Sequence, residues 1–188
     1  MGEWQKAMNL TVLGWAVEQS LKLPVPTELL KICDRWYSPY YNYFYLLALG
    51  NGGVAVELGV DQGRGSAAFT IGGCRTFGVD HTRKVGLDNL IEYTNFTFIQ
   101  SDSMPVPSQL QQAKIDFLHI DTEHSYSMAK AEFEAYQPYL NSPAVVFFDD
   151  LHAQENAVLQ YFMELPYPKI QDDRLHPVNG FGVVLYNE

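Results

Sequence analysis

The sequence predicts an α/β fold: a doubly wound, mostly parallel seven-stranded sheet with an antiparallel last strand, preceded by a helical preface. Three observations predict it. From residue 54 onward, short apolar runs alternate with segments in which apolar residues recur every three or four positions, as in amphipathic helices. Several of these runs show no polar alternation, which is typical of parallel strands covered by helices on both faces. Before residue 48 the chain shows helical spacing and no strand alternation.

The helical preface is predicted over residues 1–48. Leu10, Leu13 and Val17 fall on one helical face. The stretch 36–45 is unusually aromatic, and two interpretations stay open for it: its rings pack a helix against the sheet, or some of them close over a ligand as a lid. The aromatic surface is also a candidate homodimer interface. The lid candidates are Trp36, Tyr37 and Tyr40.

The core elements follow the preface in order. Apolar runs predict buried strands at 54–58, 76–79, 96–99, 115–120 and 144–148. Helical spacing predicts helices at 85–93, 108–113 and 126–140, and another that begins after Leu151 and ends before Pro166. Two last strands, 169–175 and 181–186, are joined through an Asn-Gly turn and are expected to pair antiparallel. We therefore expect one domain, 1–188, with a ligand-binding α/β core at 54–188.

Composition indicates an ordered, soluble protein. The chain has 188 residues, 47% of them hydrophobic, which allows a sizeable core and excludes a disordered protein. A formal net charge of −10 without a Lys/Arg cluster disfavours nucleic acid as a partner. The sequence has neither a secretory leader pattern nor an apolar run of membrane-spanning length, so we expect a cytoplasmic protein without a membrane partner. Cys33 and Cys74 are too few and too far apart for a disulfide framework or a zinc site.

A glycine-rich turn follows the first core strand, in the segment VAVELGVDQGRGS that starts at Val54. Gly59, Gly63 and Gly65 let the backbone approach a bound molecule closely, and the next helix presents unpaired N–H groups beyond them. The order G-x-x-x-G-x-G differs from the G-x-G-x-x-G of dinucleotide sites, and no Gly-Lys-Ser/Thr of a P-loop follows. The alternative is a turn that only joins a strand to a helix.

Acidic residues follow the next two strands. Asp80 ends the second strand about 20 residues beyond the glycine turn, where a carboxylate can accept hydrogen bonds from ribose hydroxyls. Asp102 follows the third strand and could accept from an adenine amino group. Each residue alone could be a helix N-cap instead. In this order after the glycine turn, the two indicate an adenosine site.

Three further carboxylates end the fourth and fifth strands. In a doubly wound sheet these ends lie beside the first strand, so Asp121, Asp149 and Asp150 are expected to converge next to the glycine turn. Carboxylates this close repel unless a cation neutralises them, and an all-oxygen set suits Mg²⁺ or another hard divalent ion. The alternative is that Asp149 and Asp150 cap the next helix.

Two residues compete for the role of general base. His124 lies three residues after Asp121, and an imidazole near its ordinary pKa is a suitable base. Glu123 is the competing base, and a capping or surface role for His124 stays open. His119 is expected to point into the sheet as a structural residue. His152 is only a candidate for supporting the ligands.

Residues 54–152 resemble the metal-dependent small-molecule O-methyltransferases of the macrocin and catechol type, within the class I S-adenosylmethionine-dependent methyltransferases. The resemblance rests on VELGVDQGRGS, GVD, FLHIDTEHSY and VVFFDD, and it implies a Rossmann-like fold. It implies that the methionine part of the cofactor is surrounded by Glu57, Gly59, Gly63, Gly65 and Ser66, with Asp80 on ribose and Asp102 near adenine. It also implies metal binding by Asp121, Asp149 and Asp150, and His124 as a base in an Asp-x-x-His arrangement.

The sequence departs from that group at two places. Thr122-Glu123 replaces a Gly-Asp pair that is frequent in the loop, which leaves open whether His124 or Glu123 is the base. Asp150 stands where catechol-type enzymes often have Asn, which favours the macrocin-like side.

We expect transfer of the methyl group of S-adenosylmethionine to a hydroxyl of a small molecule, a sugar, diol or phenol, with Mg²⁺ or another divalent cation. The alternative is a non-catalytic S-adenosylmethionine- or nucleotide-binding domain with a regulatory or assembly role. A nicotinamide-dependent oxidoreductase is disfavoured by the glycine spacing.

Overall fold

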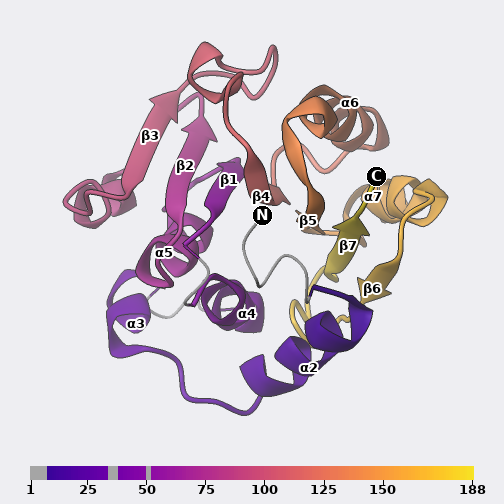
Figure 1. The fold of residues 1–188 in the computed structure, drawn as a ribbon, viewed down its shortest axis with the longest axis horizontal. Coiled ribbons are helices and arrows are strands. Elements are labelled where there is room, and N and C mark those ends of the chain that lie inside the picture. The colour runs from indigo at the N-terminus through magenta and orange to yellow at the C-terminus, as the bar shows by residue number, and fades with distance from the viewer. Residues whose placement is uncertain (1–7, 34–37, 50–51) are drawn as a thin grey trace.

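A computed structural model of the chain describes residues 8–33, 38–49 and 52–188. It contains one seven-stranded sheet in the order β3-β2-β1-β4-β5-β7-β6 (Figure 1). The central strands are parallel, whereas β7 runs antiparallel to both β5 and β6. The strands are β1 Val54–Leu58, β2 Arg75–Asp80, β3 Phe96–Gln100, β4 Ile115–Ile120, β5 Leu140–Phe148, β6 Lys169–Gln171 and β7 Gly182–Tyr186. The predicted doubly wound, Rossmann-like α/β fold is therefore confirmed.

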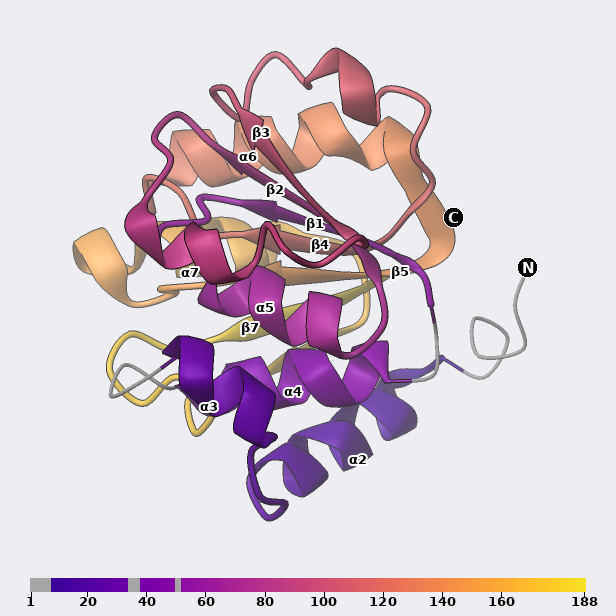
Figure 2. The ribbon, with the colours of Figure 1, turned by 90° about the vertical axis from the view of Figure 1, so that its left-hand side faces the viewer.

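Helices cover both faces of the sheet (Figure 2). On one face lie α2 (Leu10–Ser20), α3 (Thr27–Cys33), α4 (Pro39–Ala48) and α5 (Arg64–Ile71). On the other face lie α6 (Tyr126–Tyr136) and α7 (Ala153–Glu164), which contact each other. Because both faces are covered, β4 is buried along its whole length. This burial explains the apolar run that predicts a buried strand at 115–120.

The N-terminal preface contributes to the core. Asn9 caps α2 by accepting a hydrogen bond from the Val12 backbone N–H, and Leu13 and Val17 are buried as the spacing predicts. In α4 the aromatic side chains point inward: the ring centroids of Phe44 and Phe69 of α5 stack at 4.4 Å. The packing interpretation of the aromatic stretch is therefore confirmed for its helical part. Trp36 and Tyr37 lie outside the described residues.

Four predicted elements are shorter in the structure. The expected helices at 85–93 and 108–113 are only the 3-10 turns Val85–Asn89 and Ser108–Leu110, and Gly86 disfavours helix growth in the first. The helix expected at 126–140 ends at Tyr136, because Pro138 cannot continue it. The strand expected at 169–175 ends at Gln171, and residues 172–180 form a long loop rather than a tight Asn-Gly hairpin. A third 3-10 turn, Gln137–Tyr139, connects α6 to β5.

The first turn of α7 has an unusual backbone. Gln154, Glu155 and Asn156 have positive φ values of 46°, 59° and 66°. The side-chain amide of Gln154 donates to the backbone carbonyl of Glu123 at 2.7 Å, so this turn is tied to the loop after β4. Within the described part of the chain, no helix combines the length and the apolar character that crossing a membrane requires.

Candidate active site

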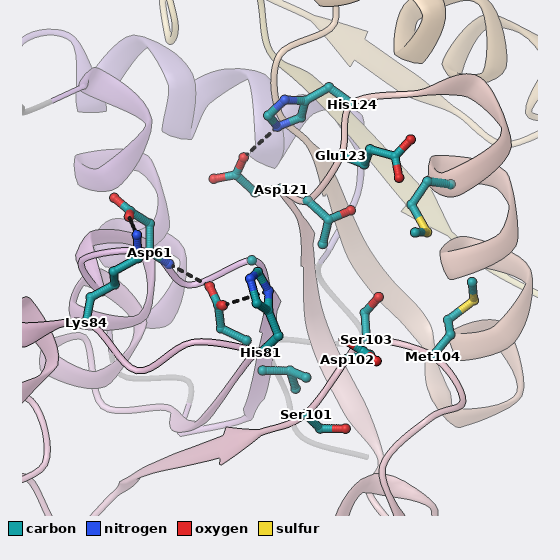
Figure 3. Close-up of a pocket in the computed structure, with 15 residues that line it drawn as sticks. Asp61, His81, Lys84, Ser101, Asp102, Ser103, Met104, Asp121, Glu123 and His124 are labelled. Carbon is teal, nitrogen blue, oxygen red and sulfur yellow. Dashed lines mark hydrogen bonds and ion pairs between the residues drawn. The ribbon is translucent and has the colours of Figure 1, made fainter.

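A cleft of about 790 Å³ opens at the carboxyl ends of the parallel strands (Figure 3). Its volume falls in the range that small-molecule sites occupy. In open α/β sheets, ligands bind at the point where the strand order reverses. In this sheet the order reverses next to β1, and the cleft lies there. The cleft is lined by Gly59, Asp61, Val79, Asp80, His81, Lys84, Ser101, Asp102, Ser103, Met104, Asp121, Thr122, Glu123, His124 and Met128.

The register of the sheet brings the predicted residues to this edge. Leu58 of β1 lies beside Ile120 of β4, which lies beside Phe148 of β5. The ladder continues one residue further, because the Asp121 N–H donates to the Leu58 carbonyl and the Asp149 N–H donates to the Ile120 carbonyl. Asp121 and Asp149 are therefore neighbours where the sheet ends.

The glycine turn fits against other parts of the protein. Gly59 has a φ of 84°, and a Cβ there would lie 1.8 Å from the carbonyl oxygen of Asp121. A Cβ on Gly65 would lie 2.0 Å from Oε1 of Glu57. Gly59 lines the cleft, whereas Gly63 and Gly65 are not among its lining residues. These glycines therefore allow close internal approaches, and their contact with a cofactor stays a prediction.

Glu57 points beneath the turn. It is 2% exposed, and its Oε2 accepts hydrogen bonds from the backbone N–H and the hydroxyl of Ser66 at the start of α5. Its Oε1 lies 3.0 Å from Nδ1 of His119, the residue beside it in the register of β1 and β4. Glu57 and Ser66 thus hold helix and strands together and do not line the cleft, and the structural interpretation of His119 agrees with its complete burial.

The two acidic residues predicted for adenosine both line the cleft. Oδ2 of Asp80 accepts from the backbone N–H groups of Val60 and Asp61 at 3.0 and 3.1 Å, and its Oδ1 accepts from that of Thr82 at 2.9 Å. Nδ1 of His81 lies 3.3 Å from the same Oδ1, so Asp80 fixes the glycine-rich loop through both of its oxygens. Neither Asp80 nor Asp102 is a helix N-cap: the next turns begin at Val85 and Ser108.

A cluster of three aspartates and two histidines, hereafter the Asp–His cluster, adjoins the cleft. His124 lies between two carboxylates: its Nε2 is 2.9 Å from Oδ1 of Asp121, and its Nδ1 is 3.3 Å from Oδ2 of Asp150. His176, from the loop between β6 and β7, places Nδ1 2.9 Å from Oδ1 of Asp149 and 3.3 Å from Oδ1 of Asp150. His124 thus links Asp121 to Asp150, and His176 links Asp149 to Asp150. Asp149, Asp150 and His176 form one set of mutually close ligand atoms, whereas Asp121 forms another with Glu57 and His119, so convergence of the three aspartates on one ion stays a prediction.

Asp149 is held on both of its oxygens. His176 contacts Oδ1, and the hydroxyl of Tyr40 donates to Oδ2 at 3.1 Å. The Tyr40 ring is 3% exposed and stacks on Phe181 with a centroid distance of 4.8 Å. Tyr40 therefore supports the cluster from within the core instead of closing over it as a lid. The bonds of Asp149 and Asp150 go to the cluster and to Asn179, not to the first turn of α7, so neither side chain acts as a helix cap.

Comparison with protein families identifies the chain. A family profile described as a methyltransferase domain matches residues 56–151, from β1 to the loop after β5. The chain belongs to this methyltransferase family. Among curated proteins, 58 residues are 38% identical to the uncharacterized protein y4gI of Sinorhizobium fredii. That match spans 30% of the chain and only 6% of the relative's length.

Solved structures share the fold of this methyltransferase domain at low identity. The methyltransferase PaMTH1 of Podospora anserina, bound to SAH, is 12% identical with a TM-score of 0.69, covering 100% of this chain and 97% of that one. An O-methyltransferase of Bacillus cereus in complex with SAH is 15% identical with a TM-score of 0.65, covering 94% and 97%. CalS11, a TDP-rhamnose 3′-O-methyltransferase, is 18% identical with a TM-score of 0.60, covering 95% and 94%. The predicted resemblance to class I methyltransferases is confirmed.

The Asp–His cluster of the methyltransferase domain shifts the pKa of its members. Burial and the charge of Asp149 raise the pKa of Asp121 to about 6. Burial opposes the charged form of His124 and His176, but the hydrogen bonds to Asp121 and Asp149 together with the charges of the three aspartates outweigh it and raise both imidazole pKa values. The pKa of His119 is raised in the same way, by its hydrogen bond to Glu57 and by the charge of that carboxylate, although burial opposes it. Without a metal ion, protonated imidazoles are therefore the charges that neutralise the carboxylates.

This pattern predicts a pH-dependent stability of the metal-free methyltransferase domain. A raised histidine pKa contributes stability that is complete below the unfolded value of about 6.5 and is lost as pH rises through the folded value. The thermal midpoint in a chelator should therefore fall above pH 6.5, by about 2–4 °C for each kcal/mol lost. Scanning calorimetry from pH 6 to 9 measures it, and saturating divalent cation should reduce the fall. A midpoint that stays constant or rises across this range contradicts the prediction.

Sequence reasoning missed two residues of this methyltransferase site. His176 was assigned only to a turn, and its placement depends on how the loop folds back over β5. Glu132 of α6 is fully buried and accepts a hydrogen bond from the hydroxyl of Thr122 at 2.8 Å, which supports the cleft wall. A signal for Glu132 was available, because it lies one turn from both Ala129 and Tyr136 on the apolar face of the helix. His152, expected to support the ligands, contacts Asn156 and Asp173 instead.

Proposed function

We propose that this methyltransferase domain transfers the methyl group of S-adenosylmethionine to a hydroxyl of a small molecule, assisted by a divalent cation. One observation carries the proposal: a single cleft extends from Asp80 and Asp102 to Asp121, Glu123 and His124. Residues suited to an adenosyl group and residues suited to acid–base chemistry therefore share one space. Such proximity allows a donor carbon and an acceptor oxygen to be held in line, an effect that can contribute several kcal/mol.

The charge of the cleft supports the cofactor. Its wall carries five carboxylates and one lysine, and the side chain of that lysine, Lys84, pairs with Asp61 at 3.7 Å. An acidic wall suits a sulfonium donor, which is positively charged. Asp80 lines the cleft beside the glycine-rich loop, and we assign its carboxylate to the ribose hydroxyls, which would take the place of the exposed His81 side chain 3.3 Å from Oδ1. Asp102 lines the cleft beside Ser103 (Figure 3), and we assign its carboxylate to the adenine amino group.

The donor set of the Asp–His cluster fits a divalent cation. Three carboxylates meet there, Asp149 is 4% exposed, and in this structure imidazole nitrogens stand between the carboxylate pairs. Asp121, Asp149 and Asp150 would hold the ion. When bound, a divalent cation supplies Lewis acidity that lowers the pKa of an acceptor hydroxyl.

The two candidate bases differ in their surroundings. His124 lies in the cleft wall against Asp121, whereas the Glu123 side chain lies on the side of Met104, away from the carboxylate of Asp121 (Figure 3). An imidazole between Asp121 and Asp150 accepts a proton at low cost, because both neighbours stabilise its cationic form. We therefore assign His124 as the residue that removes the proton of the acceptor hydroxyl. The acceptor is proposed to be a sugar, diol or phenol.

Binding of S-adenosylhomocysteine, the demethylated cofactor, tests the proposed cofactor site. Asp102→Asn should weaken the affinity for S-adenosylhomocysteine about 10-fold, equivalent to about 1.4 kcal/mol, because the charged acceptor of the adenine amino group becomes a neutral one. Glu134→Gln is the matched control, since it also removes one charge but lies on the exposed face of α6, where it pairs with Lys130. Isothermal titration calorimetry measures both. Equal affinities for wild type and Asp102→Asn contradict the assignment of Asp102.

An assay of methyl transfer tests the proposed reaction and its dependence on a cation. Pooled sugars, diols and phenols incubated with S-adenosylmethionine labelled in the methyl group should yield labelled product, and a chelator should abolish it. Label transfer that persists in chelator removes the cation from the proposal. Cofactor binding without transfer to any pool, with or without metal, would favour a non-catalytic binding domain.

A further inference from the structure

We propose that His176 supplies a nitrogen ligand to the cation site, together with Asp149 and Asp150, and that this mixed set selects a first-row transition-metal dication such as Mn²⁺ or Co²⁺ over Mg²⁺. The inference deepens the proposed function and rests on it, since it concerns which ion the Asp–His cluster holds. It replaces the expectation of an all-oxygen site.

The geometry of His176 carries the argument. Its Nδ1 faces two carboxylates at once, at 2.9 Å from Asp149 and 3.3 Å from Asp150. One donor atom from each of the three residues lies within 4.8 Å of the other two, which is the separation expected of ligands around one ion. The ring nitrogen and the two carboxylate oxygens therefore lie close enough together to bind one ion as a set of three ligands.

The loop that carries His176 is fixed on several sides. The Tyr40 backbone N–H donates to the carbonyl of Leu175 at 3.1 Å, and the Gly180 N–H donates to the carbonyl of His176 at 2.8 Å. The side chain of Asn179 donates to Oδ1 of Asp150 at 2.9 Å. The imidazole of His176 also packs edge-on against the Tyr40 ring, with centroids 5.5 Å apart. The structure therefore positions this nitrogen before any ion binds.

The other two histidines in this region, His119 and His124, have different partners. His119 is fully buried and directs Nδ1 to Glu57. His124 lies between Asp121 and Asp150, and it also lines the cleft, where a base is needed. His176 does not line the cleft. A nitrogen from His176 therefore completes the site without using the proposed base.

Ligand type then sets the choice of ion. Mg²⁺ is bound through oxygen and keeps several waters, whereas imidazole favours transition metals, with affinity rising from Mn²⁺ towards Co²⁺ and Ni²⁺. A site that adds one imidazole to its carboxylates should therefore bind Mn²⁺ and Co²⁺ more tightly than Mg²⁺. If only the carboxylates bound the ion, the difference between the affinities for Mn²⁺ or Co²⁺ and for Mg²⁺ would be smaller.

Two measurements on the whole chain test the inference, with Mn²⁺, Co²⁺ and Mg²⁺ themselves as probes. Calorimetry gives the ratio of Mn²⁺ to Mg²⁺ affinity, which should fall about 10-fold in His176→Gln and stay unchanged in His152→Gln. The control is matched because His152 faces the same loop but binds Asn156 and Asp173. Pulsed electron paramagnetic resonance of bound Mn²⁺, with ¹⁵N-histidine labelling, should detect a directly bound nitrogen that His176→Gln removes. Unchanged S-adenosylhomocysteine affinity shows that the variant is folded.

The outcomes separate the inference from the proposed function. If Mn²⁺ binds at Asp149 without nitrogen coupling, or if His124→Gln rather than His176→Gln removes the coupling, the inference is wrong while the cation-dependent function stands. If no divalent cation binds in a way that Asp149→Asn abolishes, the cation part of the proposed function fails as well. Loss of the nitrogen coupling and of the Mn²⁺ preference in His176→Gln alone supports the inference.

Discussion

Replacing Gly59 with alanine is expected to lower the free energy of unfolding by about 2–6 kcal/mol. Two costs add: a non-glycine residue at a φ of 84° costs about 1–3 kcal/mol, and forcing a methyl group into a packed position costs a similar amount. The second cost arises because the Cβ would meet the carbonyl oxygen of Asp121 at 1.8 Å and the Cα of Thr122 at 3.2 Å. Chemical denaturation of the metal-free protein measures the loss.

Gly73→Ala is the control for this substitution. Gly73 has a φ of 104°, so it carries the backbone cost, but a Cβ there meets no atom within 4 Å. Its loss should be limited to about 1–3 kcal/mol. Equal losses at the two positions would show that the contact with the end of β4 contributes nothing. The comparison therefore isolates the close approach of β1 and β4 from conformational strain.

The second large effect concerns the two candidate bases. His124→Gln is expected to lower kcat by about 10²–10⁴-fold, the usual contribution of a positioned general base. Glutamine keeps hydrogen-bonding groups near Asp121 and Asp150 but cannot take up a proton. Glu123→Gln should change kcat less than about 3-fold, because that side chain lies on the Met104 side of the cleft (Figure 3). Steady-state kinetics with an accepted substrate measures both variants.

Cation binding must be checked alongside these rates. His124 contacts two proposed cation ligands, so a variant could lose activity by losing the ion. Calorimetry on His124→Gln should show a change in cation affinity that is small compared with the loss of kcat. A larger loss of kcat in Glu123→Gln than in His124→Gln would assign the base to Glu123 and leave His124 as a structural link between carboxylates.

The strand ends explain how much of the site could be predicted. Asp80, Asp121 and Asp149 each end or follow an apolar strand, and parallel strands end at a common edge, so their placement follows from chain order and sheet topology alone. The preface helix α2 likewise follows from spacing and its cap. These features depend on local pattern and on general rules for α/β sheets.

Other features depend on contacts between distant parts of the chain. Glu57 was assigned to the cofactor, but its carboxylate faces His119 and Ser66, and a sequence does not state which way such a residue points when a buried partner is available. His176 contacts Asp149, 27 positions earlier, through a loop that is fixed by the Tyr40 N–H on one side and by the bond from Asn179 to Asp150 on the other. Ligand contacts, acceptor identity, homodimer formation and cytoplasmic location stay predictions.

The two parts of the candidate site come from different segments of the chain. Among the described residues, none after Met128 lines the cleft, whereas Asp149, Asp150 and His176 all come from β5 and the segment beyond it. The proposed donor-binding half is thus encoded before residue 130 and most of the proposed ion-binding half after residue 145. We therefore expect that exchanging the segment after β5 for that of another family member would change the proposed cation site more than the cleft.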